Sequence, residues 1–233
     1  MSTFNSSQPV GEIVNKFPKA AEIFKQYKID FCCGGDKILK TVIEKQNLNE
    51  KEILDKINNL YEEFSNSGDK NWVDASLEEL MEQIINKHHA YLWDELPKIS
   101  KLATTILRVH GEHHPELKKV HKLFHTVKME LETHLTSEET IQYPAIRNYI
   151  KSNDKADLEK AIKIIDDLKD EHTAAGDILK ELREVTNDYA IPDDVCETFV
   201  LTYKKLQEME SDIFHHIHLE NNILFPKLEG LMK

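Results

Sequence analysis

The chain has 233 residues, 40% of them hydrophobic and 31% charged, which is an ordinary composition for a globular protein with a sizeable core. Its formal net charge of −12 argues against a nucleic-acid-binding surface, because such a surface needs clustered Lys and Arg. The sequence has only three cysteines and no stretch near the roughly 20 apolar residues of a membrane span, so we expect a cytoplasmic protein in a reducing compartment that binds neither nucleic acid nor membrane.

The N-terminal quarter of the chain carries short helical patterns. We expect helices at about 18–27, at 36–46 and from residue 49 onward, with a turn at 30–35 between the first two. The stretch 65–75 is polar and lacks a helical apolar period, which is typical of a linker. We therefore predict a small helical domain at 1–64, a linker at 65–75 and a larger domain at 76–233.

The larger domain is predicted to be a helical bundle. Ser76 and Glu79 form a capping-box pattern at the start of its first helix. Apolar residues then recur at steps of three and four over four long segments, with turn residues at 111–115, 151–154 and 187–192 between them. This register puts Ile85 and Ile141 on the buried face. Four helices with short connections predict an all-α, up-down-up-down bundle.

Six titratable side chains lie on the predicted buried faces of these helices, where the pattern requires apolar residues. Burying them costs several kcal/mol unless each is paired, and metal coordination pairs them all. Two His-x3-Glu pairs stand one helical turn apart, and in both a Pro follows the Glu by six residues. Four imidazoles and two carboxylates suffice for two metal ions bridged by carboxylates. The six predicted ligands are His89, His134, Glu138, His172, His216 and Glu220.

The ligand set also bears on the metal and on its surroundings. Imidazole and carboxylate without thiolate favour iron or manganese over structural zinc, although zinc held for stability stays open. The poorer helical register of His88 makes it a non-ligand. Glu130 and Glu171 are candidate acids for the outer shell of the metal site. His218 is expected at the surface, with a place in the outer shell of the metal site as the alternative.

The adjacent cysteines Cys32 and Cys33 precede two glycines and an expected helix start at Asp36. A thiol near a helix N-terminus is more reactive, because its thiolate is stabilised. Metal binding, thiol exchange with a partner and simple packing all remain open for this pair. Cys196 is expected in the core of the fourth bundle helix.

The segment Asp-Phe-Cys-Cys-Gly-Gly at 30–35, followed by a hemerythrin-like bundle, resembles the di-iron iron–sulfur cluster repair proteins of the ScdA or RIC family over nearly the whole chain. The family's six iron ligands fall on the six residues predicted above, and its cysteine motif falls on Cys32 and Cys33. The resemblance implies two non-haem iron ions per chain, bridged by an oxo group and by carboxylates. It also implies that the two cysteines act as redox or partner-contact thiols.

The function implied by this resemblance is repair of iron–sulfur clusters damaged by oxidative or nitrosative stress, by donating iron to damaged iron–sulfur proteins. A hemerythrin-like protein that binds or senses oxygen or nitric oxide, or a nitric oxide reductase, is the alternative. Whether the protein is an enzyme stays open, because iron donation is stoichiometric and nitric oxide reduction is turnover. We also expect a homodimer, since the short N-terminal segment has a marginal core of its own.

Overall fold

The computed structural model describes residues 3–64 and 72–232, so the predicted linker lies largely outside the described residues. Within these ranges the chain forms helices and no strand, apart from one isolated bridge between Pro9 and Ile38. The prediction of an all-α protein is confirmed. A search of the described helices for a segment long and apolar enough to cross a bilayer finds none.

The chain divides into two compact units. One unit comprises Met1–Leu80 together with Ile217–Lys233, and the other comprises Met81–His216. Both boundaries fall inside helices, and the C-terminal segment from Ile217 is grouped with the N-terminal helices. The predicted domain limits at 64 and 76 stay a prediction.

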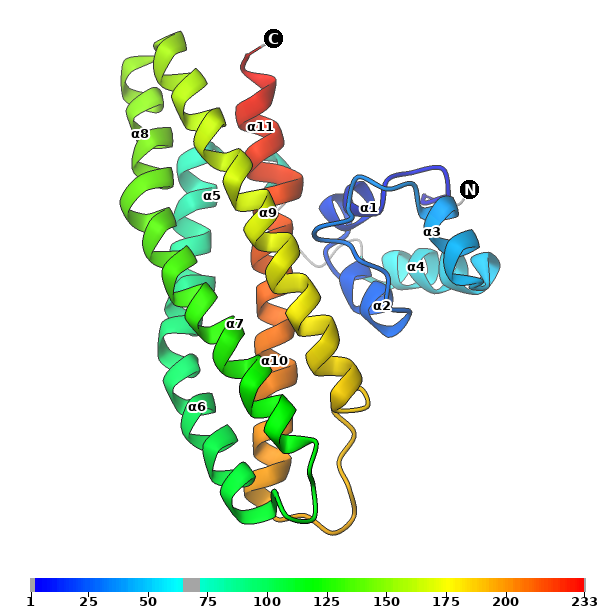
Figure 1. Ribbon diagram of the computed structural model, residues 1–233. Helices are drawn as coiled ribbons and strands as arrows, with labels where there is room; N and C mark the ends of the chain where they lie inside the picture. Colours follow the sequence, from blue (N-terminus) through cyan, green and yellow to red (C-terminus); the bar gives the residue numbers. More distant parts are fainter. Residues whose placement is uncertain (1–2, 65–71, 233) are drawn as a thin grey trace. The chain divides into compact units, whose positions relative to one another are not determined.

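The N-terminal part of the first unit is built from four short helices (Figure 1). Its core is formed by side chains such as Phe4, Phe24, Ile53 and Ile57, which are almost fully buried, and α2 packs on α4. The helix α1, which has seven residues, is not among the predicted helices. The helices are α1 (Val10–Lys16), α2 (Ala20–Gln26), α3 (Leu39–Gln46) and α4 (Glu50–Phe64), and a 3-10 turn, η1, follows at Trp72–Asp74.

The second unit contains the predicted bundle. In Figure 1 the helices α6, α7, α9 and α10 alternate in direction along the chain, and α7 packs against both α6 and α9. Core side chains such as Phe124, Leu168 and Ile213 are fully buried along these contacts. The helices that lie wholly in this unit are α6 (Ala90–His110), α7 (Leu117–Ser137), α8 (Tyr143–Ser152) and α9 (Lys155–Val185). The helices α5 (Leu77–Gln83) and α10 (Glu197–Leu219) cross the unit boundaries, and α11 (Phe225–Gly230) belongs to the first unit.

Three π-helical turns interrupt these helices. They are η2 (Ile84–His89), η3 (Glu138–Gln142) and η4 (Glu220–Leu224). Each begins or ends at a predicted metal ligand, namely His89, Glu138 or Glu220. Such turns are rare and occur frequently at functional sites.

The π-helical turns shift the buried face relative to an ideal α-helix, because a π-turn holds more residues than an α-turn. As a result Ile84 is fully buried and Ile85 is not. Ile141 is 53% exposed, while the neighbouring Gln142 is buried. The predicted register is therefore wrong at Ile85 and Ile141.

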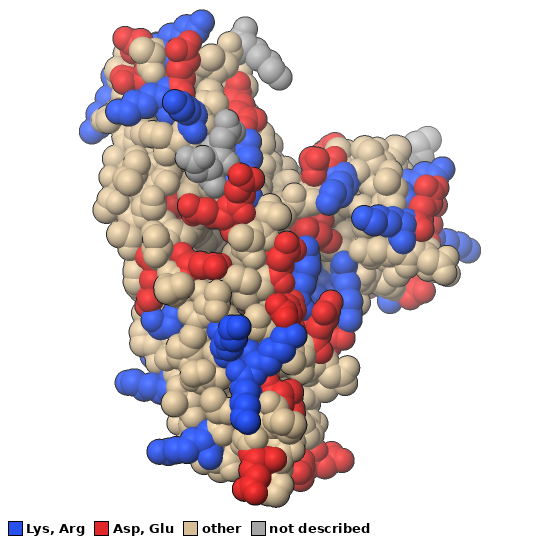
Figure 2. All heavy atoms as spheres, viewed as in Figure 1, with Lys and Arg blue, Asp and Glu red and all other residues tan. Residues whose placement is uncertain are grey.

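Charged side chains of both signs cover the face shown in Figure 2. Acidic and basic groups are interspersed there. Along the described helices, exposed pairs stand one helical turn apart, such as Lys16 with Glu12 and Lys98 with Asp94. Exposed pairs of this kind contribute little to stability. On this face the excess of acidic residues does not form a continuous acidic field.

The predicted capping box at Ser76 is confirmed. The Ser76 amide donates to Oε2 of Glu79 at 2.9 Å, and the Glu79 amide donates to Oγ of Ser76 at 3.2 Å. We expect Ser76→Ala to lower the free energy of unfolding by about 1 kcal/mol, because the Glu79 amide at the start of the helix loses its acceptor. Urea denaturation of the metal-free protein measures this. Ser76→Thr keeps the hydroxyl and should stay near wild type; an equal loss in both variants would contradict the capping role.

Candidate metal centre

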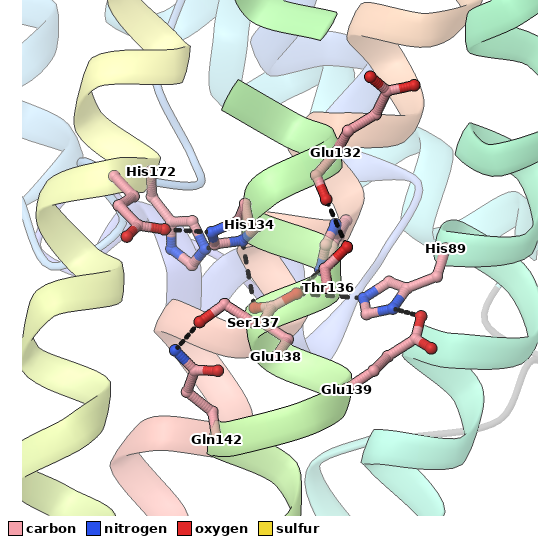
Figure 3. Close-up of polar contacts among 11 residues, drawn as sticks. His89, Glu132, His134, Thr136, Ser137, Glu138, Glu139, Gln142 and His172 are labelled. Carbon is pink, nitrogen blue, oxygen red and sulfur yellow. Dashed lines mark hydrogen bonds and ion pairs between the residues drawn. The ribbon is translucent and has the colours of Figure 1, made fainter. Parts of the chain in front are cut away.

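Two groups of histidine and glutamate ligand atoms converge inside the second unit (Figure 3). In one, the ligand atoms of His134, Glu138 and His172 all lie within 4.8 Å of one another. In the other, those of His89, Glu138 and His216 do the same. All five side chains are buried, and Glu138 belongs to both groups. The fold thus brings these five predicted ligands together, with Glu138 shared by both sets of imidazoles.

The two oxygens of Glu138 face different imidazoles. Oε1 lies 3.1 Å from Nε2 of His134, whereas Oε2 lies 3.2 Å from Nε2 of His89 and 3.6 Å from Nε2 of His216. The Nε2 atoms of His134 and His172 are 3.2 Å apart. The carboxylate therefore lies between two sets of imidazole nitrogens, which is the position that a bridging ligand needs.

Glu138 is an anion in a fully buried place. Burial alone would raise its pKa, but the charge of His134 and the nearby imidazoles outweigh burial and hold the pKa of Glu138 well below its usual value. These imidazoles are close to Glu138 without hydrogen-bond alignment: among the described residues, none completes a hydrogen bond to either oxygen of Glu138 or to Nε2 of His89. A buried anion without hydrogen bonds is costly. Metal ions between these atoms would satisfy them, and the nitrogen and oxygen donors suit iron.

Two of the histidine rings are bound by carboxylates at Nδ1, the nitrogen that faces away from Glu138. Nδ1 of His134 donates to Oε2 of Glu171 at 2.6 Å, and Nδ1 of His89 donates to Oε1 of Glu139 at 2.9 Å (Figure 3). Each contact occupies Nδ1 of the ring, which leaves Nε2, the nitrogen close to Glu138, as the atom that can bind a metal once it is deprotonated.

Sequence reasoning placed Glu171 near the site but missed Glu139. Glu139 is next to Glu138 in the chain and therefore lies about 100° further round the helix, off the predicted buried face. Its adjacency to a predicted ligand was the available signal.

Glu130 is not among the carboxylates that contact these histidines. It stands one turn before His134 on the same helix, and its place in the outer shell of the metal site stays a prediction. The Nδ1 atom of the His134 ring is bonded to Glu171 instead.

His88 is buried but lies outside both ligand groups. Its Nδ1 atom is 2.8 Å from Oδ1 of Asp212, and its ring stacks on that of His216 with centroids 5.9 Å apart. Burial lowers the pKa of His88 even though Asp212 acts in the opposite direction. This residue packs as a neutral ring behind the His216 ligand position.

Glu220 lies beyond the boundary between the units and is described with the first of them. It is fully buried and follows His216 by one turn of the continuous helix formed by α10 and η4. That spacing repeats the spacing of His134 and Glu138, and it places Glu220 on the helix face of His216. Its role as a ligand stays a prediction.

The cysteine loop differs from its prediction. The helix α3 begins at Leu39 rather than Asp36, so neither thiol lies at a helix N-terminus. The two sulfurs are 3.8 Å apart, and Oδ1 of Asp30 accepts hydrogen bonds from the amides of both cysteines. The hydrogen bond with Cys33, followed by burial, raises the pKa of Cys32 well above its usual value. The expected activation is therefore wrong for Cys32.

Cys196 is exposed, whereas it was predicted to lie in the core. It immediately precedes α10, at the solvent-facing end of that helix. Its sulfur lies 3.1 Å from Nε2 of His110, and this contact, with the amides of Phe199 and Thr198, lowers the pKa of Cys196 to about 7. The free amides at the N-terminus of a helix stabilise the thiolate in the same way.

We therefore expect iodoacetamide to alkylate Cys196 much faster than Cys32 at neutral pH. The rate at Cys196 should rise with pH and reach half its maximum at about 7, because the thiolate is the nucleophile. Peptide mapping by mass spectrometry after timed quenching measures both rates. In His110→Ala the midpoint should move to higher pH. Equal rates at Cys196 and Cys32 at pH 7 would refute the assignment.

Comparison with known proteins covers both parts of the chain. Residues 6–61 match the ScdA_N family, a domain of unknown function, and residues 80–228 match the hemerythrin HHE cation-binding domain. The chain is 31% identical to the iron–sulfur cluster repair protein ScdA of Staphylococcus haemolyticus, over 94% of this chain and 96% of that protein. It is 32% identical to a probable iron–sulfur cluster repair protein of Haemophilus influenzae, over 96% and 97% of the two chains. The repair protein YtfE of Escherichia coli O157:H7 is 31% identical over 94% and 96%.

Proposed function

Because the chain belongs to the family of ScdA- and YtfE-type iron–sulfur cluster repair proteins, we propose that it restores damaged iron–sulfur clusters by donating iron from a two-iron centre. The observation that carries this proposal is Glu138, a buried carboxylate placed between two sets of imidazole nitrogens. Iron held there is the cargo that a damaged cluster lacks. The clients are iron–sulfur proteins.

We assign the ligands in two sets. His134 and His172 would bind one ion, and His89 and His216 would bind the other. Glu138 would bridge the two ions, which is supported by its membership of both ligand groups. Glu220 would be the second carboxylate, supported by its burial and by its spacing from His216.

The chain's own residues would control how firmly iron is held. Glu139 and Glu171 keep the rings of His89 and His134 turned so that Nε2 binds metal. Since protons compete with metal for imidazole and carboxylate, affinity for iron should fall as the pH is lowered. Imidazole and carboxylate ligands therefore suit a centre that releases its iron. Thiolate ligands would suit such a centre less well.

Cys32 and Cys33 are proposed as the thiols that contact the client or a redox partner. Support comes from their place in a formed loop, with Cys32 buried and Cys33 partly exposed. The homodimer stays a prediction, which light scattering of the purified protein checks.

The test is reactivation of an iron–sulfur hydratase damaged by nitric oxide. The protein loaded with ferrous iron should restore hydratase activity, while the metal-free protein and the loaded Glu138→Ala variant should not. Free ferrous iron with a reductant serves as the positive control. If free iron reactivates the hydratase and the loaded protein does not, repair by donation is excluded. Reversible binding of nitric oxide by the loaded protein without reactivation would favour a gas-binding role.

A further inference from the structure

The cysteine loop is bound to the helical turn that carries Glu220, and all of these residues belong to the first unit. Nδ2 of Asn222 donates to the carbonyl of Cys32 at 2.9 Å and to that of Phe31 at 3.3 Å. Nδ1 of His218 donates to the same Phe31 carbonyl at 3.1 Å. His218, expected at the surface, is buried. Two side chains one helical turn apart thus hold the backbone of the loop at Phe31 and Cys32.

Glycines make room for the Asn222 amide. A Cβ at Gly35 would lie 2.1 Å from Oδ1 of Asn222, and one at Gly11 would lie 2.3 Å from it. The Gly11 amide donates to the Gly35 carbonyl at 2.8 Å, and Nδ2 of Asn15 donates to the Asn222 carbonyl at 3.0 Å. The side-chain amide of Asn222 therefore fills a close-packed space between the cysteine loop and α1. Any other side chain at either glycine would push it out.

Glu220 lies between His218 and Asn222 in the sequence, two residues from each. Residues two apart on a helix point in nearly opposite directions, whereas residues four apart share a face. The turn thus offers His218 and Asn222 to the cysteine loop on one side and Glu220 on the other. A movement of this turn therefore displaces both the cysteine loop and Glu220.

We propose that Asn222 and His218 couple the Cys32–Cys33 loop to metal binding at Glu220, so that iron loading shields the cysteines and modification of the cysteines weakens iron binding. This inference rests on the proposed ligand role of Glu220. An ion bound to Glu220 holds the turn in place, and the turn then holds the loop with Cys32 buried. Opening of the loop and binding of iron are the two linked equilibria, so iron should suppress opening by the same factor by which an open loop weakens iron binding.

The experiment compares alkylation of the cysteine pair in the metal-free and the iron-loaded protein. Cys196→Ser is the background, so that its reactive thiol does not interfere. Under anaerobic conditions, iodoacetamide should label Cys32 and Cys33 about tenfold more slowly after loading with ferrous iron, within the usual range of coupling. In the pre-alkylated protein, ferrous iron should bind about tenfold more weakly.

Two variants break the contact from opposite sides. Asn222→Ala removes the amide from the helix, and Gly35→Ala displaces it from the loop. In both, the alkylation rates with and without iron should become equal. Asn221→Ala removes the same kind of side chain from the next position and should keep the wild-type ratio. Circular dichroism confirms that each variant folds.

The outcomes separate the coupling from the proposed function. Wild-type protein that binds two irons but is alkylated at one rate in both states overturns the coupling and leaves iron donation intact. Folded Asn222→Ala and Gly35→Ala proteins that keep the tenfold ratio also overturn it. Shielding that persists in Glu138→Ala, which lacks the bridging carboxylate, would mean that iron binds the cysteines directly and would refute coupling through the turn. Wild-type protein that binds no iron would overturn the proposed function first.

Discussion

Glu138→Ala should weaken the binding of ferrous iron by more than about 100-fold. Removal of a carboxylate that merely supports a metal ligand typically costs 10–100-fold in affinity, and Glu138 is proposed as a direct ligand of both ions. Its two oxygens face separate imidazoles, so no neighbouring side chain can replace both contacts. Anaerobic titration and metal analysis after desalting measure the loss.

Two controls make this result specific. Glu139→Ala removes only the support of His89 and should cost about tenfold. Glu132 lies on the same helix and pairs with Lys128, away from the ligands. The Glu132→Ala variant should therefore bind ferrous iron with wild-type affinity. Two irons bound to Glu138→Ala with wild-type affinity would show that Glu138 is not a ligand.

The bundle and the convergence of its ligands were predictable because both follow from local periodicity. A polar residue that recurs at an apolar position of a helix must face the core, whatever the rest of the chain does. Four such helices with short connections can pack in few ways. His134 and Glu138 were recognised in this manner, and the structure brings them within 3.1 Å.

Other features depend on departures from an ideal helix, and periodicity cannot report those. The π-turns that begin at Glu138 and end at His89 shift the register, which is why Ile141 is exposed. A sequence pattern assigns each residue to one side of a helix. Glu139 was therefore assigned to the exposed side, just off the predicted buried face. The start of α3 at Leu39 likewise has no clear sequence signal.

Contacts between residues far apart in the sequence are the last kind of feature that the sequence patterns did not predict. His218 and Phe31 are 187 residues apart, and their hydrogen bond depends on how a loop packs on a helix. A histidine off the predicted buried face was assigned to the surface, because sequence alone does not reveal what covers it. Asn222 and the two glycines around its amide belong to the same class.

Arg183→Met should lower the free energy of unfolding by about 3–5 kcal/mol, the usual effect of removing one partner from a buried ion pair. Arg183 on α9 donates to both oxygens of Glu210 on α10, at 2.6 to 3.2 Å, and Glu210 is only 3% exposed. The variant keeps most of the side-chain volume but leaves Glu210 without its cation in the core.

The double variant Arg183→Met/Glu210→Gln distinguishes the pair's own contribution from this penalty. A buried pair recovers in attraction about what it loses in desolvation, so the double variant should regain most of the lost stability. Urea denaturation of the metal-free proteins measures this, because bound metal would add its own stabilisation. The pair joins the two helices that carry His172 and His216. If the double variant is as stable as wild type yet binds iron more weakly, the pair serves to align those ligands; if it stays as unstable as Arg183→Met, the pair is a net source of stability.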